Sequence, residues 1–197
     1  MQKKSTAFTV LCFFVIIAFL TGCASFSKPS ESNFKDPVIS LDSMEVAHSF
    51  GYWYFSSKVK PTKGNPGNFG APLDLAFTFN IQNPNSYSVM LEDIKYTVAF
   101  DEFDLNSVSS TATQWIPAGK TNQVRVHAHF DVRQSLLSLL VTGGFKLKEK
   151  GTNAWEQLEA WWTRIPNYEI TINVKDGAAI FKADGIVRVV PFSATFP

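Results

Sequence analysis

Alternation of apolar and polar residues constrains this chain most strongly at residues 73–85, LDLAFTFNIQNPN. Apolar side chains occupy every second position from Leu73 to Ile81, and most residues between them are polar. A strand directs successive side chains to opposite faces, so the pattern predicts a strand with one buried face and one polar face. The strand should end at Asn83-Pro84-Asn85, because proline lacks a backbone donor and asparagine suits a turn.

Other segments show the same two-residue period. They are residues 38–46, 94–100, 124–132, 168–174 and 186–196. A change of phase at Glu92-Asp93 predicts a β-bulge, and turns are expected at Asp176-Gly177 and Asp184-Gly185. Pro191 predicts that the last strand lies at a sheet edge or contains a bulge, because proline cannot donate to a strand pair. The chain is therefore predicted to be mainly β.

A helical segment is predicted at about residues 133–165, between the late strands. Its leucine-rich first part, residues 136–141, predicts a short helix that stops at Gly143-Gly144 and is followed by a charged link. Asn153 is expected to cap a second helix that continues to Arg164. Pro166 should end this helix.

Three tryptophans lie in the second predicted helix. They are Trp155, Trp161 and Trp162. Apolar residues recur there at three- and four-residue intervals, which favours packing of the helix against a sheet. The alternative is contact of the indole rings with an apolar ligand or a membrane interface. Two glutamates in the same helix weaken the membrane interpretation.

The amino terminus resembles that of a bacterial lipoprotein. Lys3 and Lys4 precede an apolar run at residues 7–20, and Leu-Thr-Gly-Cys follows at residues 20–23. The run is shorter than the roughly 20 residues that a membrane-spanning helix needs, so a cleaved signal is favoured over an uncut anchor. The likeness to a lipobox implies removal of residues 1–22. Cys23 would then carry acyl chains such as palmitate.

Lipidation of Cys23 would place the protein in the cell envelope. Cys12 would leave with the signal peptide, so no internal disulfide is expected. Residues 23–36 are rich in serine and are predicted to form a flexible tether about 20 Å long on average, ahead of one domain at residues 37–197. In a bacterium with two membranes, Ala24 after the cysteine would favour the periplasmic face of the outer membrane.

The predicted strand that ends in Asn83, Pro84 and Asn85, with VMLEDIKYTVAF after it, resembles the WHy (water stress and hypersensitive response) domain of type-2 late embryogenesis abundant proteins. The likeness extends over residues 37–197. It includes an I-P-A-G-K turn at residues 116–120 and a closing V-P-F strand. The resemblance implies an immunoglobulin- or fibronectin-III-like antiparallel β-sandwich with an attached helix. It also implies stress protection, as in desiccation, or non-catalytic binding, with no agreed active site.

Charge and motifs argue against several other functions. Without the signal peptide the chain has sixteen Lys and Arg against seventeen Asp and Glu. This balance gives no support for binding to nucleic acid or for electrostatic adhesion to anionic lipid. The sequence has no nucleophile elbow, no zinc-protease motif and no phosphate-binding loop, so we expect no enzyme activity and no cofactor.

Two clusters were considered as metal ligands. His127 and His129 lie on one face of a predicted strand, at a spacing that would let two imidazoles share an ion. No third ligand is visible in the sequence, and Arg125 beside them would oppose a cation. The acids at residues 101–104 lack the spacing of a calcium loop. We therefore expect solvated polar surfaces and no metal site.

Two alternatives to a protective module remain. The first is a carrier for a lipid or another apolar ligand, suggested by the aromatic run at residues 50–55 and by Trp155, Trp161 and Trp162. The second is a structural partner in an envelope assembly, with a sheet edge or the helical segment as its interface.

Overall fold

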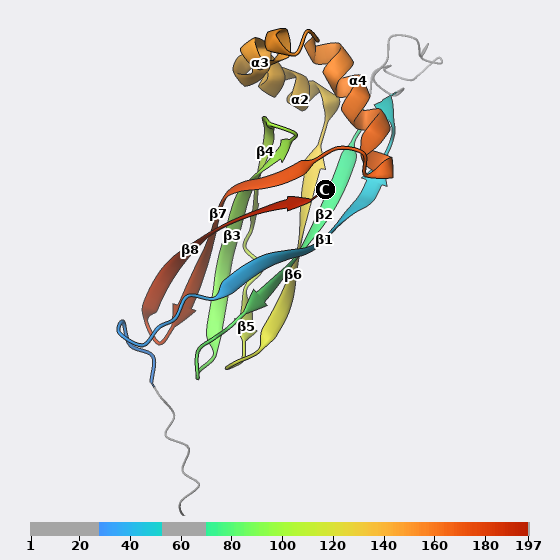
Figure 1. The fold of residues 1–197 in the computed structure, drawn as a ribbon. Coiled ribbons are helices and arrows are strands. Elements are labelled where there is room, and N and C mark those ends of the chain that lie inside the picture. Colours follow the sequence, from blue (N-terminus) through green and yellow to red (C-terminus); the bar gives the residue numbers. More distant parts are fainter. Residues whose placement is uncertain (1–27, 53–69, 197) are drawn as a thin grey trace, which may run out of the picture.

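The computed structural model describes residues 28–52 and 70–196. These residues form two antiparallel sheets that face each other, with helices at one end (Figure 1). The result confirms the predicted mainly-β sandwich with a helical segment between late strands. The predicted signal peptide, Cys23 and residues 53–55 of the aromatic run lie outside the described residues.

The smaller sheet has the order β1-β2-β6. Its strands are β1 (Val38–Ser49), β2 (Leu73–Gln82) and β6 (Thr121–Phe130). The larger sheet has the order β4-β3-β7-β8, and β5 (Gln114–Ile116) also pairs with β3. Its other strands are β3 (Val89–Phe100), β4 (Phe103–Ser110), β7 (Ile172–Ala183) and β8 (Ile186–Phe196).

The core lies between the sheets, and the alternating strand β2 forms its centre. The alternating apolar side chains of β2 are buried, as predicted, because they pack against the opposite sheet, where Phe77 and Phe79 contact Tyr96 of β3. Strands β1 and β6 pair with the two edges of β2. Phe79 contacts the rings of Tyr96 and Phe192, with centroid distances of 5.3 and 5.5 Å. Burial of such aromatic side chains is the main stabilising contribution of a core of this kind.

Irregular positions in the strands follow most of the predictions. The register of β3 against β7 shifts between Leu91 and Asp93, which confirms the predicted bulge. Pro191 lies in β8 at the edge of the sheet, and Asp184-Gly185 forms the turn between β7 and β8. The predicted turn at Asp176-Gly177 is wrong. Both residues lie within β7 at a register shift, where a Cβ on Gly177 would come within 2.5 Å of the Phe192 carbonyl oxygen.

The helical region connects β6 to β7. It consists of α2 (Val132–Ser138), the π turn η2 (Leu139–Gly143), α3 (Gly144–Glu149), α4 (Ala154–Arg164) and the 3-10 turn η3 (Ile165–Asn167). Asn153 caps α4 as predicted, because its Oδ1 accepts hydrogen bonds from the amides of Trp155 and Glu156. Asp131 caps α2 in the same way.

The predicted helix stop at Gly143-Gly144 is wrong, because the chain stays helical from α2 through η2 into α3. Gly143 is needed for close packing: a Cβ at this position would lie 3.1 Å from Cδ1 of Phe103. Both glycines have right-handed helical dihedrals instead of the left-handed conformation of a helix-ending glycine. Within the described residues, no helix is long and apolar enough to cross a membrane.

Candidate functional site

Asn83, the first residue of the N-P-N motif, joins two turns of the sandwich. Its side chain is fully buried. The Nδ2 group donates hydrogen bonds to the carbonyl oxygens of Tyr87, Ile116 and Pro117, at 2.8, 3.0 and 3.2 Å. The backbone amide of Asn83 donates to the Lys120 carbonyl at 2.9 Å. Asn83 therefore holds the turn between β2 and β3 against the turn between β5 and β6.

The second asparagine of the motif extends this network. Oδ1 of Asn83 accepts hydrogen bonds from the backbone amide and from Nδ2 of Asn85, both at 3.0 Å. The Asn85 carbonyl accepts from the amide of Gly119 at 3.1 Å. Gly119 has a φ of +64°, a backbone conformation that glycine adopts without strain. The N-P-N motif and the I-P-A-G-K turn are thus one hydrogen-bonded unit.

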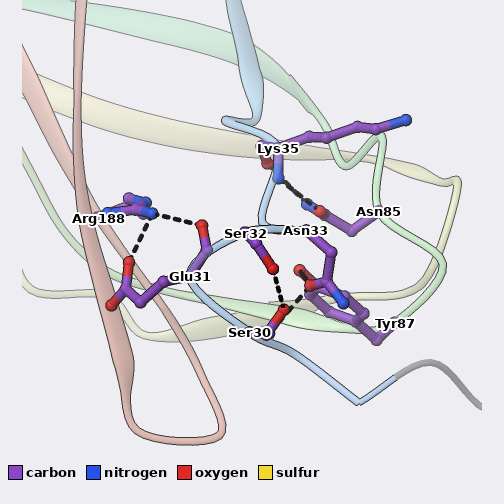
Figure 2. Close-up of polar contacts among 8 residues, drawn as sticks. All are labelled: Ser30, Glu31, Ser32, Asn33, Lys35, Asn85, Tyr87 and Arg188. Atoms are coloured by element: carbon purple, nitrogen blue, oxygen red, sulfur yellow. Dashed lines mark hydrogen bonds and ion pairs between the residues drawn. The ribbon is translucent and has the colours of Figure 1, made fainter.

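Asn85 also binds the chain that precedes β1 (Figure 2). Its Nδ2 donates to the Lys35 carbonyl at 2.7 Å, and its Oδ1 accepts from the Lys35 amide at 2.8 Å. The amide side chain therefore pairs with the backbone as a neighbouring strand would. Asn85 itself is buried, with 3% of its surface exposed, so water competes little for these two bonds.

The residues before Lys35 contact the same end of the sandwich (Figure 2). Tyr87 donates from its hydroxyl to Oδ1 of Asn33 at 3.0 Å. Arg188 of β8 pairs with the Glu31 carboxylate at 2.6 Å and donates to the Glu31 carbonyl at 3.0 Å. We call this set of contacts the N-terminal clasp. It consists of Glu31, Asn33 and Lys35 together with Asn85, Tyr87 and Arg188.

An apolar contact completes the N-terminal clasp. Phe34 is buried, its ring centroid lies 6.3 Å from that of Tyr87, and the Arg188 guanidinium lies 5.7 Å from its centre. Residues 28–36, the C-terminal part of the predicted tether, are therefore attached to the domain. Phe34 is the one large apolar residue of residues 28–36, and its burial explains an attachment that the serine-rich composition does not predict.

The structure separates the three tryptophans. Trp161 and Trp162 are buried in the core, where Trp161 Nε1 donates to Asp101 Oδ2 at 2.8 Å and Trp162 Nε1 donates to the Ala71 carbonyl at 2.7 Å. Trp155 has half of its surface exposed. Packing of α4 against the sheets thus accounts for Trp161 and Trp162, whereas Trp155 lies partly exposed at the surface.

His127 and His129 point outward from β6 toward a residue of β2. Nδ1 of His127 lies 2.9 Å from Oδ2 of Asp74, and Nδ1 of His129 lies 3.3 Å from Oδ1 of the same carboxylate. Because Asp74 is distant in sequence, the strand pattern alone did not reveal it. Across residues 28–52 and 70–196, no group of three or more His, Cys, Asp or Glu side chains is arranged to hold a metal.

The acids at residues 101–104 bind other side chains of the domain. Asp101 accepts from Trp161, Glu102 pairs with Lys150 at 3.2 Å, and Asp104 pairs with Lys175 at 2.6 Å. These contacts tie the turn between β3 and β4 to the helical region and to β7. The residues thus have structural partners at the position where a calcium loop had been considered.

An open groove of about 410 Å³ lies between β4 and the helical region. Its lining residues are Thr97, Asp104, Leu105, Asn106, Ser107, Leu137, Ser138, Val141 and Thr142. Both the strands and the helical region contribute polar residues to the lining, and Leu137 and Val141 of the helical region add apolar side chains. The lining has one acid, Asp104, which is paired with Lys175, and no histidine or cysteine.

The fold and the junction define a β-sandwich module in which the N-P-N motif joins two turns to the N-terminal segment. No family model matches the chain, and no curated protein matches it. A solved protein from Archaeoglobus fulgidus aligns at 13% identity over 80% of this chain and 94% of that one, with a TM-score of 0.41. One from Bordetella pertussis aligns at 13% identity over 83% and 93%, with a TM-score of 0.41.

A structure named as a late embryogenesis abundant protein is also among the neighbours. It aligns at 11% identity over 100% of this chain and 87% of that chain, with a TM-score of 0.29. TM-scores this low carry no argument about function.

Proposed function

We propose that this chain is a lipid-anchored, non-catalytic module of the cell envelope, of the WHy class of type-2 late embryogenesis abundant proteins. It would bind or protect other macromolecules under a stress such as desiccation. The observation that carries the proposal is the bond between Asn85 and Lys35. Through it the N-P-N motif, on which the family resemblance rests, holds the segment that leads from Cys23 into the domain.

The N-terminal clasp would determine which end of the sandwich lies near the membrane if Cys23 carries lipid. Lys28 follows Cys23 by five positions, which span at most about 18 Å, so the clasped end would stay near the membrane. The helices lie at the opposite end of the sandwich (Figure 1). A strand of 12 residues such as β1 is about 40 Å long, so the helical end would project outward when the domain stands upright.

A non-catalytic role agrees with the chemistry of the described site. The polar groups of Asn83 and Asn85 are engaged in bonds to backbone groups of neighbouring segments, as in a structural joint. Trp161 and Trp162 occupy the space beneath α4, where an enclosed apolar ligand had been considered. The proposal therefore favours macromolecule binding at the surface over transport of a ligand in the interior.

The anchor is tested by acylation in cells. Cells that express the chain are fed radiolabelled palmitate, and the protein is recovered from membrane and soluble fractions. We expect label in the native chain and in Cys12→Ser, and no label in Cys23→Ser. Because Cys12 would leave with the signal peptide, it is the matched control. Equal labelling of the Cys23→Ser chain would overturn the anchor.

The protective role is tested separately. The full chain, purified in detergent, is dried together with a test enzyme, and the recovered enzyme activity is compared with that after drying with an equal mass of albumin in the same detergent. We expect higher recovery with this protein. Recovery no better than with albumin would contradict protection and leave only the binding role.

A further inference from the structure

The helical segment from α2 to α3 is apolar on two sides. Its inward side packs against the sandwich, and its buried residues are Val132, Ser135, Leu139, Gly143 and Leu147. A second set points to solvent: Leu137, Leu140, Val141 and Phe145 are 63, 61, 82 and 89% exposed. A surface helix of a globular domain normally has one apolar stripe. The second set, which we call the outer stripe, is not needed for packing of the described domain.

The π turn helps to align the outer stripe. Leu137, Leu140 and Val141 are three and four residues apart, as on one face of a helix. Phe145 follows Leu137 by eight residues, which would rotate it by about 80° in a regular helix with 3.6 residues per turn. The π turn η2 adds a residue to one turn and so brings Phe145 back toward the stripe.

Basic side chains accompany the outer stripe. Residues 132–150 contain Arg133, Lys146, Lys148 and Lys150 but one acid, Glu149. All five side chains are exposed. Lys150 pairs with the Glu102 carboxylate and Lys146 donates to the Glu102 carbonyl, so both point toward the turn between β3 and β4. Lys148 has no ion pair among the residues that the structure describes. Residues 132–150 therefore have an excess of basic side chains, although the charge of the whole chain is nearly balanced.

We propose that the outer stripe is a docking surface for an anionic lipid bilayer. Leu and Phe side chains would enter the boundary between headgroups and acyl chains, while the lysines extend to the phosphates. Each basic residue near such a surface adds to the attraction. A protein partner fits less well, because the centres of protein interfaces are depleted in lysine. The surface lies at the end opposite the N-terminal clasp (Figure 1), so it is distinct from the proposed anchor.

Backbone hydrogen exchange of the full chain tests this surface. The chain is incorporated through its N-terminus, or added from solution if it carries no lipid, to vesicles of phosphatidylcholine alone or of an equimolar mixture with phosphatidylglycerol. We expect exchange in residues 132–150 to slow several-fold only with the anionic vesicles. Exchange in β7 and β8 should stay the same.

Variants separate the contributions to docking. Leu140→Ser with Phe145→Ser should abolish the protection, and Lys146→Gln with Lys148→Gln should weaken it and reduce its dependence on salt. Val187→Ser with Val189→Ser removes two exposed apolar side chains from β8 and should change nothing. Equal exchange in neutral and anionic vesicles would overturn the proposal. So would protection that rises with protein concentration in the absence of anionic lipid, because it would indicate self-association.

The outcome is independent of the acylation experiment. A chain that lacks lipid on Cys23 would still show protection at residues 132–150 if the outer stripe binds anionic bilayers. A lipidated chain without this protection would keep the anchor and lose the docking surface.

Discussion

The side chain of Asn85 pairs with the backbone of Lys35 through both of its polar atoms, at 2.7 and 2.8 Å. Among side chains of this length, only an amide offers a donor and an acceptor side by side at neutral pH. The same amide is bound on its other side by Asn83. The N-P-N motif is thus a structural joint between the sandwich and the segment that precedes it.

Replacement of Asn83 by aspartate should be strongly destabilising. Asn83→Asp keeps the shape but removes the donor to three carbonyl oxygens and places a buried negative charge beside them. We expect the free energy of unfolding to fall by about 3 kcal/mol or more. Urea denaturation measures the change. Asn106→Asp is the control, since Asn106 Nδ2 makes one exposed bond to the His129 carbonyl, and its loss should cost about 1 kcal/mol or less.

Truncation of Asn85 should release the N-terminal segment. Asn85→Ala leaves the amide and carbonyl of Lys35 without their partner, at a cost of about 1–3 kcal/mol. Limited trypsin digestion with mass spectrometry should show faster cleavage after Lys35 than in the native chain. Glu31→Gln removes an exposed ion pair that contributes about 1 kcal/mol at most, so trypsin should cleave this variant at close to the native rate. Equal protection of all three chains would show that Asn85 does not hold this segment.

Tyr96 should make stability depend on alkaline pH. Burial raises the pKa of its phenol well above that of a free tyrosine, while the unfolded chain ionises near pH 10. The pKa of Tyr96 is higher in the folded than in the unfolded chain, so its full contribution to the free energy of unfolding is present below pH 10. Above pH 10 the free energy of unfolding falls, by up to about 1.4 kcal/mol per pH unit. Burial also raises the pKa of Tyr52 and of Tyr87.

Tyr96→Phe removes the contribution of this phenol. Denaturation midpoints measured across pH 8 to 11 should fall less steeply for the variant than for the native chain. Below pH 10 the variant should be as stable as the native chain or more stable by about 1 kcal/mol, because the Tyr96 hydroxyl is buried without a hydrogen-bond partner in the described residues. Identical slopes for the two proteins would mean that Tyr96 does not cause the loss of stability at alkaline pH.

The tryptophans provide a direct comparison of core and surface. Trp162→Ala removes a buried ring and its bond to the Ala71 carbonyl, and we expect a loss of about 3–5 kcal/mol. Trp155→Ala changes a half-exposed side chain and should cost much less, about 1 kcal/mol. Thermal unfolding followed by circular dichroism measures both. Similar losses of stability in the two variants would contradict the burial of Trp162 in the core and the exposure of Trp155 at the surface.

Local patterns were sufficient for most of the strands. Period-two alternation predicted β2 because one face of this strand lies in the core and the other is mostly polar. The phase change at Glu92-Asp93 located the bulge in β3. Asn153 was recognisable as a helix cap from its position alone. In each case the sequence signal lies within a few consecutive residues.

Contacts between distant residues explain what was missed. Gly143 and Gly177 suggested a helix end and a turn, but each lies where another strand approaches closely, through Phe103 and Phe192 respectively. Asp74 joins the two histidines from a neighbouring strand, and the N-terminal clasp brings together residues more than 150 positions apart. No local pattern encodes such pairings, so the tether was predicted to be free along its whole length.

The two adjacent glycines of the helical segment should respond to alanine in opposite directions. Gly144 is helical, and a Cβ there would meet nothing within 4 Å, so Gly144→Ala should raise the free energy of unfolding by about 0.5–1 kcal/mol through helix propensity. A Cβ at Gly143 would lie 3.1 Å from Cδ1 of Phe103. That ring is 3% exposed and packs against Trp161 at 5.5 Å, so it has little room to move. Gly143→Ala should therefore lose about 1–3 kcal/mol through overpacking, despite the same gain in propensity. Urea denaturation of the two variants measures the difference, and stabilisation by both would mean that Gly143 is not required for the close approach of η2 to β4.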